Sequence, residues 1–459
     1  MNVNDILEKV YQSDEKFIVS YFSELDKINF TYCFALHKKG YLNSSELSQI
    51  SKISKFLKKN NYKLLIKKKY DRGYYFEYEN FFKKKIGESI SGKMHIGRSR
   101  NDLDSAIAKL ILKKNLKKNL LNQSLLLEKI REKFSSNGML FPFYTQNQFS
   151  SFLTVKHYFN SNILSFVDYL KKITQNQNFI NECPLGACGL NGSSINIDYK
   201  FISKRLNFTK LQSNSHRSVT EYEYYLSYIN DLNLSVIKWS RILQDFQILH
   251  NESNRIIKFK KEFYGKSSFF PHKQNIFLVE YALSLSNKLC NYSSLISNGI
   301  RKCINSNSFE VKAIIQTSYN YFVEFDEFIN LIMFIIQNVS FKKINILEKK
   351  YEHLYFTYFQ NYIISNKKNL NIKKINNEIF KQIMKGFSLE QVLLKNKDCL
   401  PKSVSNKDIS KIKYFLLNTN SYGMGPQDKK STNSSEIKKL LTNLKKETKK
   451  IKKYNWIYY

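Results

Sequence analysis

The chain has 459 residues, of which 42% are hydrophobic, so a disordered protein is excluded and two or three packed units are expected. Its net charge of +36 would suit a nucleic-acid partner, but excess lysine accompanies excess Asn, Ile, Tyr and Phe along the whole sequence, which indicates compositional bias. Without a run of about 20 apolar residues, a signal-peptide pattern or closely spaced cysteines, we expect a soluble cytoplasmic protein with neither metal nor cofactor.

Glycine and proline, which interrupt helices, are confined to a few segments. Residues 103–137, 193–264 and 300–385 contain neither, and their apolar residues recur at helical spacing, as Ile107, Leu110 and Ile111 do. These stretches predict long helices and argue against an all-β fold. We therefore expect an all-α bundle with functional loops at its ends. The predicted loops are residues 87–97, 138–142, 184–192, 265–271 and 401–426.

Three parts are expected in chain order. An N-terminal helical domain covers residues 1–97, a central long-helix bundle covers 98–335, and a C-terminal helical domain covers 336–459. The tail from Lys429 to Lys453 is rich in lysine. We interpret it as a solvated terminal helix and not as an arm that binds nucleic acid.

The first loop places Ser99, Arg100, Asn101 and Asp102 directly before a predicted long helix. N–H groups at a helix N-terminus and the fork of an arginine both suit carboxylates, so a dicarboxylate or amino-acid ligand is one interpretation. Simple N-capping by Ser99, Asn101 and Asp102 explains the same residues equally well.

Two later loops allow the same pair of interpretations. Residues 184–194 contain three glycines, which permit close approach to a ligand but also suit a plain helix connection. Residues 265–275 include Ser267, Lys273 and Asn275. A base that removes a proton beside a carboxylate, with a cation and an amide to stabilise the developing charge, would use such groups, although a solvated turn is the commoner explanation for one loop.

In order and spacing, the three loops together resemble the signature regions of the argininosuccinate lyases, within the fumarase and aspartase superfamily. Residues 95–102 are similar to H-T-G-R-S-R-N-D, residues 184–192 to P-L-G-x-G-A-L-x-G, and residues 266–275 to G-S-S-x-M-P-x-K-x-N. Lys266 and Phe270 depart from the third pattern, which has Gly and Met at these positions. Residues 420–423 resemble a further stretch of the family.

The resemblance implies a fumarase/aspartase-like all-α fold with a long central helical bundle. It also implies a homotetramer in which three subunits build each active site. The implied reaction is that of a carbon–nitrogen lyase, which cleaves argininosuccinate to arginine and fumarate in the last step of arginine biosynthesis. No cofactor or membrane is involved, and nucleic acid is not an expected partner.

The same resemblance implies roles for single residues. Ser267 would take a proton from the succinyl carbon, while Lys273 and Asn275 would activate it and hold the carboxylate on which charge develops. The implied substrate-binding residues are Ser99, Arg100, Asn101, Thr145, Gln148, Tyr319 and Glu324.

Residues 144–148 resemble the family's Y-T-H-x-Q, except that Gln146 stands where the family has a histidine that acts in acid catalysis. An amide cannot exchange a proton near neutral pH, whereas an imidazole can. Glu280 matches the carboxylate that pairs with this histidine. Tyr75 lies about where another histidine is expected.

Further departures lie in the stretch that binds the arginine half, where Glu324 and Glu327 replace a Gln and a Lys. His157 and His272 could supply the missing acid, although a packing or surface role explains each of them better. Besides an active argininosuccinate lyase, two alternatives remain open. One is a catalytically degenerate relative with a structural or partner-binding role, and the other is an adenylosuccinate lyase, which residues 98–102 match poorly.

Overall fold

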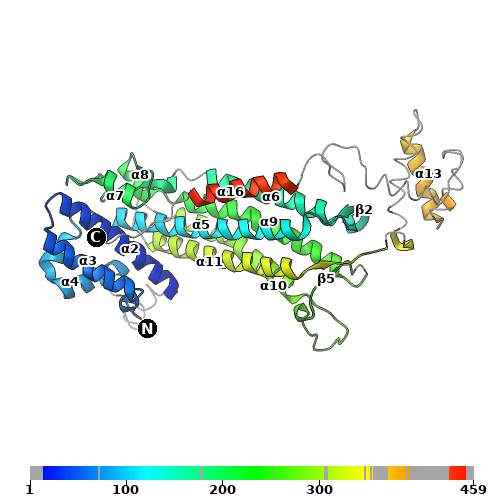
Figure 1. Ribbon diagram of the computed structural model, residues 1–459, viewed down its shortest axis with the longest axis horizontal. Coiled ribbons are helices and arrows are strands. Elements are labelled where there is room, and N and C mark those ends of the chain that lie inside the picture. Colours follow the sequence, from blue (N-terminus) through cyan, green and yellow to red (C-terminus); the bar gives the residue numbers. More distant parts are fainter. Residues whose placement is uncertain are drawn as a thin grey trace.

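The structure is a computed structural model, and its predominantly helical fold is as predicted. It also contains one β-hairpin and a few two-residue strands. It describes residues 14–70, 73–175, 179–253, 255–303, 309–345, 348–351, 354, 371–388, 391–392 and 434–450. Long helices run side by side along an elongated body, with the N-terminal helices gathered at one end (Figure 1). No helix in the described ranges is both long and apolar enough to cross a membrane.

Five helices form the long bundle within the described residues. They are α5 (Arg100–Phe134), α6 (Val155–Gln175), α9 (Glu223–His250), α10 (Phe277–Ile300) and α11 (Phe309–Asn338). Helix α10 packs against α9 and α11, and α5 packs against α6 and α11. Ile107, Leu110 and Ile111 are buried on one face of α5, as their spacing predicts. With 35 residues, α5 is about 50 Å long and separates the two ends of the bundle.

The N-terminal helices α2 (Glu15–Lys38), α3 (Ser44–Lys59) and α4 (Tyr74–Lys93) pack against one another beside the start of α5. Asp14 caps α2, and Asn43 forms a capping box with Glu46 at the start of α3. Helix α4 continues through Gly87, where a φ of 79° kinks it. The loop predicted from residue 87 therefore begins only after Lys93, and its predicted start was wrong.

Asp26 is a buried carboxylate where α2, α3 and α4 meet. It accepts hydrogen bonds from the hydroxyls of Tyr78 at 2.6 Å, Ser54 at 2.8 Å and Tyr62 at 3.1 Å. Burial raises the pKa of Asp26 to about 6, while the three hydroxyl donors act in the opposite direction. One carboxylate thus links α2, α3 and α4.

Asp26→Ala is expected to lower the free energy of unfolding by about 3 kcal/mol, because three buried hydroxyls lose their acceptor. The folded protein holds the Asp26 proton up to about pH 6, whereas the unfolded chain releases it near the ordinary value of 3.8. The folded state therefore binds more protons between these values, and the stability that Asp26 contributes declines as the pH rises through this window. Urea unfolding of both proteins at pH 4, 5, 6 and 7 would show a difference that shrinks with pH, and a difference that grows would contradict this assignment.

The stretch 193–264 is not continuously helical, contrary to the prediction. Before α9 it contains α7 (Tyr199–Arg205), β4 (Lys210–Leu211) and α8 (Ser215–Thr220). Asn207 lies just beyond α7 with a φ of 59°, and the side chain of Asn214 caps α8. At these two positions asparagine, and not glycine or proline, interrupts the helices.

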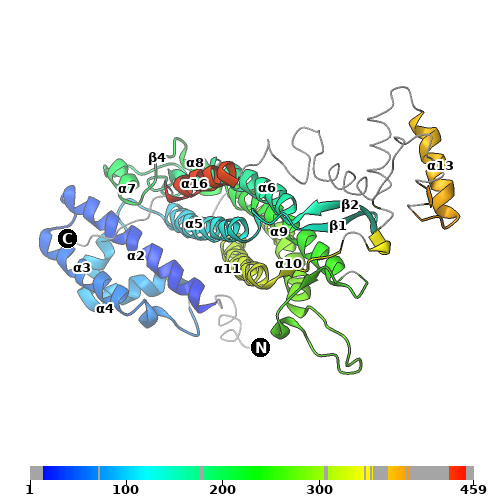
Figure 2. The ribbon, with the colours of Figure 1, turned by 45° about the vertical axis from the view of Figure 1, so that its right-hand side comes forward.

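A hairpin that we did not predict follows α5 (Figure 2). Strands β1 (Leu140–Thr145) and β2 (Gln148–Thr154) pair antiparallel, and Gln146 and Asn147 form the turn with φ values of 50° and 60°. Two central residues with positive φ are typical of a tight hairpin turn. Smaller elements are β3 (Glu182–Cys183), which pairs with β4, and β5 (Ile257–Lys258), which pairs with β6 (Ser340–Phe341). The remaining helices are η1 (Lys63–Leu65), η2 (Phe179–Asn181), η3 (Lys261–Phe263), η4 (Lys349–Tyr351) and α13 (Ile372–Met384).

The lysine-rich tail forms helix α16 (Ser434–Lys450), as predicted, but it is not solvated on all sides. It lies along α5 and α6 and buries Ile437, Leu441 and Leu444 (Figures 1 and 2). Lys445 pairs with Glu128 of α5. The predicted loop 401–426 and the motif at residues 420–423 lie outside the described residues.

Candidate functional site

The first two predicted loops meet through Asp102, in the first turn of α5. Its Oδ1 accepts the N–H of Ser99 at 3.1 Å, and its Oδ2 accepts the N–H groups of Gly186 at 3.2 Å and Cys188 at 3.1 Å. Burial raises the pKa of Asp102 to about 6, against the opposing effects of Arg98 and the three N–H donors. Loops 92–102 and 184–194 therefore form one unit at the N-terminal end of α5.

Gly97 lets these two loops pack closely. Its φ is 70°, and a Cβ at this position would lie 2.9 Å from the Cβ of Ile195. Any larger residue would therefore meet both backbone strain and a clash. The hydroxyl of Tyr199 also donates to the carbonyl oxygen of Gly97 at 3.3 Å.

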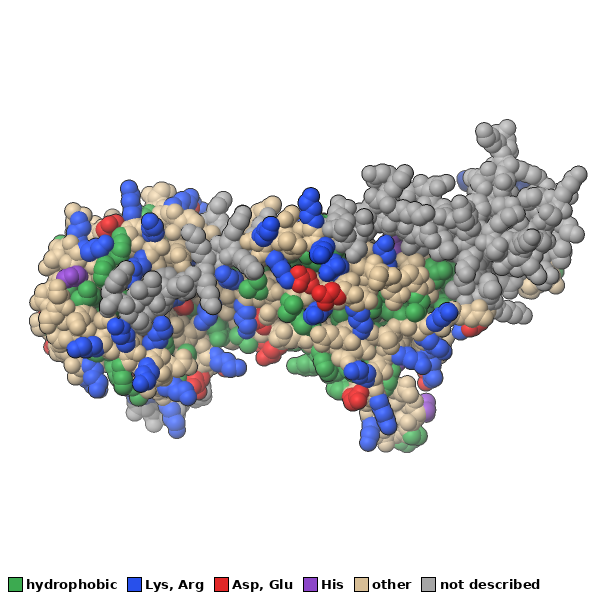
Figure 3. Space-filling model, in the orientation of Figure 1, with side chains coloured by type: hydrophobic (Ala, Val, Ile, Leu, Met, Phe, Trp, Pro, Cys, Tyr) green, Lys and Arg blue, Asp and Glu red, His purple; other side chains and the backbone are tan. Residues whose placement is uncertain are grey.

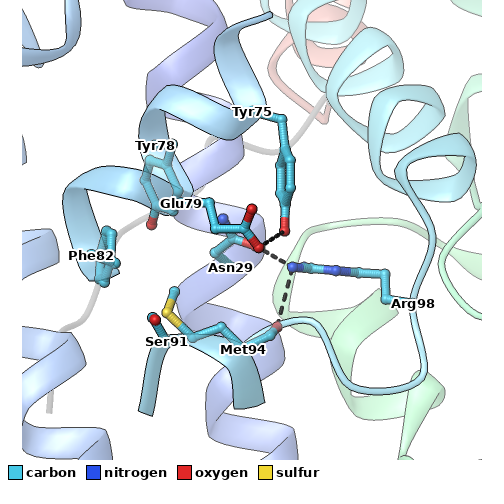
Figure 4. A pocket seen from close by; sticks show the side chains of 8 residues that line it. All are labelled: Asn29, Tyr75, Tyr78, Glu79, Phe82, Ser91, Met94 and Arg98. Carbon is cyan, nitrogen blue, oxygen red and sulfur yellow. Dashed lines mark hydrogen bonds between the residues drawn. The ribbon is translucent and has the colours of Figure 1, made fainter. Parts of the chain in front are cut away.

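Arg98 holds the first loop to α2 through its Nη2, while its Nε and Nη1 are buried without a hydrogen-bond partner among the described residues. Its Nη2 donates to Asn29 Oδ1 at 2.5 Å and to the Met94 carbonyl at 3.2 Å, and its guanidinium lies 4.6 Å from the ring centre of Tyr32. Figure 4 shows Arg98 beside a small cavity of about 10 Å³, opposite the Tyr75–Glu79 hydrogen bond. That volume suits a single water molecule, so this cavity is no substrate site.

The capping interpretation of residues 99–102 is confirmed for Ser99 and Asp102. Ser99 Oγ accepts the Asn101 N–H at 3.2 Å and forms a capping box with Asp102. Arg100 takes no part in the capping box. Its guanidinium lies 5.0 Å from the ring centre of Phe76 and lines a cavity of about 260 Å³. Arg100 thus lines a cavity and is not part of the helix cap.

His95 and Tyr75 form a pair beside Arg100. The Tyr75 hydroxyl lies 2.8 Å from His95 Nδ1. Burial, together with the smaller effects of the neighbouring Arg98 and Arg100, lowers the pKa of His95 to about 3. His95 is therefore neutral at physiological pH and serves as a hydrogen-bonding partner there.

The predicted substrate residues of α11 lie in different surroundings. The ring of Tyr319 packs on Phe17 at 5.3 Å, and Phe17 lines the same cavity as Arg100. Glu324 instead contacts α10, where it accepts from Lys288 Nζ at 2.6 Å and from the Tyr292 hydroxyl at 2.9 Å. Tyr319 thus packs on a residue that lines the Arg100 cavity, whereas Glu324 is paired with residues of α10.

Thr145, Gln146 and Gln148 lie at the tip of the β1–β2 hairpin, at the far end of the bundle from Arg100 (Figures 1 and 2). All three are exposed. Glu280 is also exposed, in the first turn of α10. His157 lies in the first turn of α6, close in sequence to the hairpin, and is partly buried.

The third loop projects from the bundle near β5 (Figure 1). The Gly265 N–H donates to the Asn275 carbonyl at 2.8 Å and closes the loop. Ser267 Oγ accepts the N–H groups of Phe270 at 3.0 Å and Phe269 at 3.4 Å. Lys273 is exposed, and so is the adjoining His272. The loop therefore presents one hydroxyl with two N–H donors aimed at it, next to an exposed cation.

Within one chain, the predicted residues fall into two groups. Ser99, Arg100, Asn101 and Tyr319 lie at the N-terminal end of α5. The hairpin tip and the third loop lie toward the other end, and α5 alone is about 50 Å long. The structure brings the first two loops together but does not bring Ser267 to Arg100 in the same chain.

Polar residues that we did not predict surround Arg100. Asp104, Tyr21 and Lys312 line the same cavity, and the Tyr21 hydroxyl donates to Asp104 Oδ1 at 2.8 Å. One sequence feature could have revealed Asp104. It is a charged residue one turn after Arg100, and the apolar residues 106–108 follow it on the same helix.

Basic side chains are spread out on the face of the molecule drawn in Figure 3. On the face drawn in Figure 3, Lys and Arg side chains are spread along the bundle and the N-terminal helices, among the residues described there. They form no single stripe on that face. This distribution agrees with compositional bias and does not favour a nucleic-acid surface.

Comparison with known proteins identifies relatives. A family model described as Lyase matches residues 9–288. The argininosuccinate lyase of Clostridium kluyveri is 27% identical over 213 residues, which are 46% of this chain and 48% of that protein. The argininosuccinate lyase of Pelagibacter ubique is 30% identical over 235 residues, or 50% of each chain. The chain spans about half the length of the curated relatives that it matches.

Solved structures share the fold over most of the chain. A crystal structure of EDDS lyase in complex with formate has a TM-score of 0.73 and 18% identity, and the match covers 97% of this chain and 87% of that one. A class II fumarase from Schistosoma mansoni has a TM-score of 0.68 and 11% identity, with 86% and 89% covered. At such identities the likeness concerns the fold.

Proposed function

The chain belongs to the lyase family of the fumarase/aspartase superfamily, and from this premise we propose that it is an argininosuccinate lyase, which cleaves argininosuccinate to arginine and fumarate. One observation carries the proposal. At the start of α5, the capping box of Ser99 and Asp102 leaves the Arg100 guanidinium to line a cavity. A helix N-terminus beside an arginine fork suits a carboxylate of the succinyl half.

We propose that the active sites are completed between chains of a homotetramer. Arg100 and Ser267 lie toward opposite ends of the bundle, so a site that uses both needs more than one copy. Large apolar side chains are exposed on the long helices, including Ile237 of α9 at 50% and Leu295 of α10 at 61%. Apolar surface of this kind is suited to burial against other subunits.

In the proposed reaction, Ser267 removes a proton from the succinyl carbon beside a carboxylate, and the carbon–nitrogen bond to arginine then breaks. A serine hydroxyl is normally too weak an acid for this role. The N–H groups of Phe269 and Phe270 point at its Oγ and would stabilise the alkoxide. Lys273 and Asn275 would stabilise the charge that develops on the carboxylate.

The leaving nitrogen needs a proton, and Gln146 cannot supply one. His272 is exposed on the same loop as Ser267, whereas His157 is partly buried in α6. Of the two, His272 is the better placed to act as the acid. Glu280 would face the neutral amide of Gln146 across the assembled site.

Purified protein incubated with argininosuccinate tests the proposal, with fumarate followed by its ultraviolet absorbance. Fumarate release is expected from argininosuccinate and not from adenylosuccinate. Release from adenylosuccinate alone would replace the proposed substrate. If neither substrate releases fumarate, the protein is a degenerate, structural relative. Gln146 and the pairing of Glu324 with Lys288 are consistent with that alternative.

Gln146→His is expected to raise turnover at neutral pH by at least about tenfold, because an imidazole near its ordinary pKa is an efficient acid and Glu280 is available to orient it. Steady-state rates of fumarate release measure the effect. The control is Asn147→His, which places an imidazole at the neighbouring position of the same turn. Equal rates for the two variants would show that position 146 has no role in proton transfer.

A further inference from the structure

A cavity of about 260 Å³ lies between α2, α5 and α11, next to Arg100. Its size is close to the lower limit of small-molecule sites. Apolar side chains form much of its wall, among them Phe17, Tyr74, Val311 and Ile315. The cavity therefore offers an apolar surface where only a few polar groups can select a ligand.

Asp104 is the polar group that stands out. It is only 6% exposed, its Oδ1 accepts from the Tyr21 hydroxyl at 2.8 Å, and its Oδ2 has no hydrogen-bond partner among the described residues. Burial raises the pKa of Asp104, while the nearby Arg100 lowers it. A buried carboxylate oxygen without a donor is uncommon, and here it belongs to a residue that lines the cavity. A hydrogen-bond donor on a ligand would satisfy it.

Two cations line the same cavity. Arg100 has a buried Nε without a hydrogen-bond partner in the described part of the chain. Burial lowers the pKa of Lys312, Arg100 adds to this effect, and Asp104 opposes it. The cavity thus combines one carboxylate and two cationic side chains on an apolar wall.

We propose that this cavity binds an α-amino acid with an apolar side chain. The ammonium group would donate to Asp104 Oδ2, the carboxylate would accept from Arg100 and Lys312, and the side chain would pack on the apolar wall. A ligand without a hydrogen-bond donor would leave Asp104 Oδ2 unsatisfied. Arg100 is also assigned to the succinyl half, so a bound amino acid would compete with substrate. Only this last consequence rests on the proposed function.

Isothermal titration calorimetry of the full chain tests the proposal with L-leucine and L-phenylalanine as probes. One saturable site per chain is expected for each. The methyl ester of L-leucine lacks the carboxylate and 4-methylpentanoate lacks the ammonium group, so neither should bind measurably. Asp104→Asn is expected to weaken binding by at least about tenfold, because an ammonium loses its charged partner. The matched control is Asp168→Asn, an exposed aspartate of α6, which should bind like the wild type.

Lys312→Gln provides a second variant on a less buried residue, and a similar loss of affinity is expected. The proposal is overturned if neither amino acid binds to folded protein, or if both variants bind them as the wild type does. Tighter binding of L-arginine than of either probe would overturn the apolar specificity. Because binding is measured without argininosuccinate, a failure to release fumarate would leave these results interpretable on their own.

Discussion

Ser267→Ala is expected to lower fumarate release from argininosuccinate by at least about a thousandfold, mainly through kcat, because the group that removes the proton is lost while the groups that bind substrate remain. The N–H groups of Phe269 and Phe270 point at Ser267 Oγ. Alanine leaves those donors without an oxygen to stabilise. The N-terminal end of α5 is unchanged by the substitution, so KM should change little.

Ser268→Ala is the matched control, since it removes a hydroxyl from the adjoining residue of the same loop. It should retain most of the wild-type turnover. Circular dichroism would confirm that both variants fold. If Ser267→Ala turns over like the wild type, or if the two variants lose activity equally, Ser267 is not the base.

Much of the helical bundle could be predicted from the sequence. Apolar spacing and the absence of glycine and proline within residues 103–137 correctly predicted a long helix, which runs over residues 100–134, because burial of apolar residues and helix propensity act together there. The same rule was wrong for residues 193–222, where Asn207 and Asn214 interrupt the helices. Asparagine adopts positive φ and caps helices, so it can do what glycine does elsewhere.

The β1–β2 hairpin was also not predicted. The turn at Gln146 and Asn147 lacks the glycine that marks most tight hairpins, although both residues have positive φ. Likewise, the lysine-rich composition of α16 concealed an apolar face that packs on α5 and α6. Charge content described the exposed side of that helix, while the spacing of Ile437, Leu441 and Leu444 determined its packing.

The candidate site was predictable only in pieces. Ser99, Arg100 and Asn101 were predicted from the family resemblance of residues 95–102, and in the structure Asp102 joins their loop to residues 186 and 188. The partners of Arg100 in its cavity come from α2 and α11, far along the chain. No local pattern reports such contacts, because they arise from packing between helices that are distant in sequence.

In the proposed enzyme, Arg100 of one chain and Ser267 of another complete each active site. If so, two variants that are inactive alone should complement one another and restore fumarate release when they assemble together. Arg100→Ala lacks the carboxylate-binding group, and Ser267→Ala lacks the base, so each alone should be inactive. In an assembly that contains both, a site can draw its intact Arg100 from one subunit and its intact Ser267 from another.

The decisive measurement is therefore fumarate release by Arg100→Ala and Ser267→Ala chains produced together in equal amounts. Random mixing gives intact copies of both residues in about a quarter of the sites, so activity should recover to about a quarter of the wild-type rate. A chain that carries both substitutions, produced with Arg100→Ala, should stay inactive and serves as the control. If co-assembled Arg100→Ala and Ser267→Ala chains, verified by native mass spectrometry, release no fumarate while the wild type does, Arg100 and Ser267 do not act together across subunits.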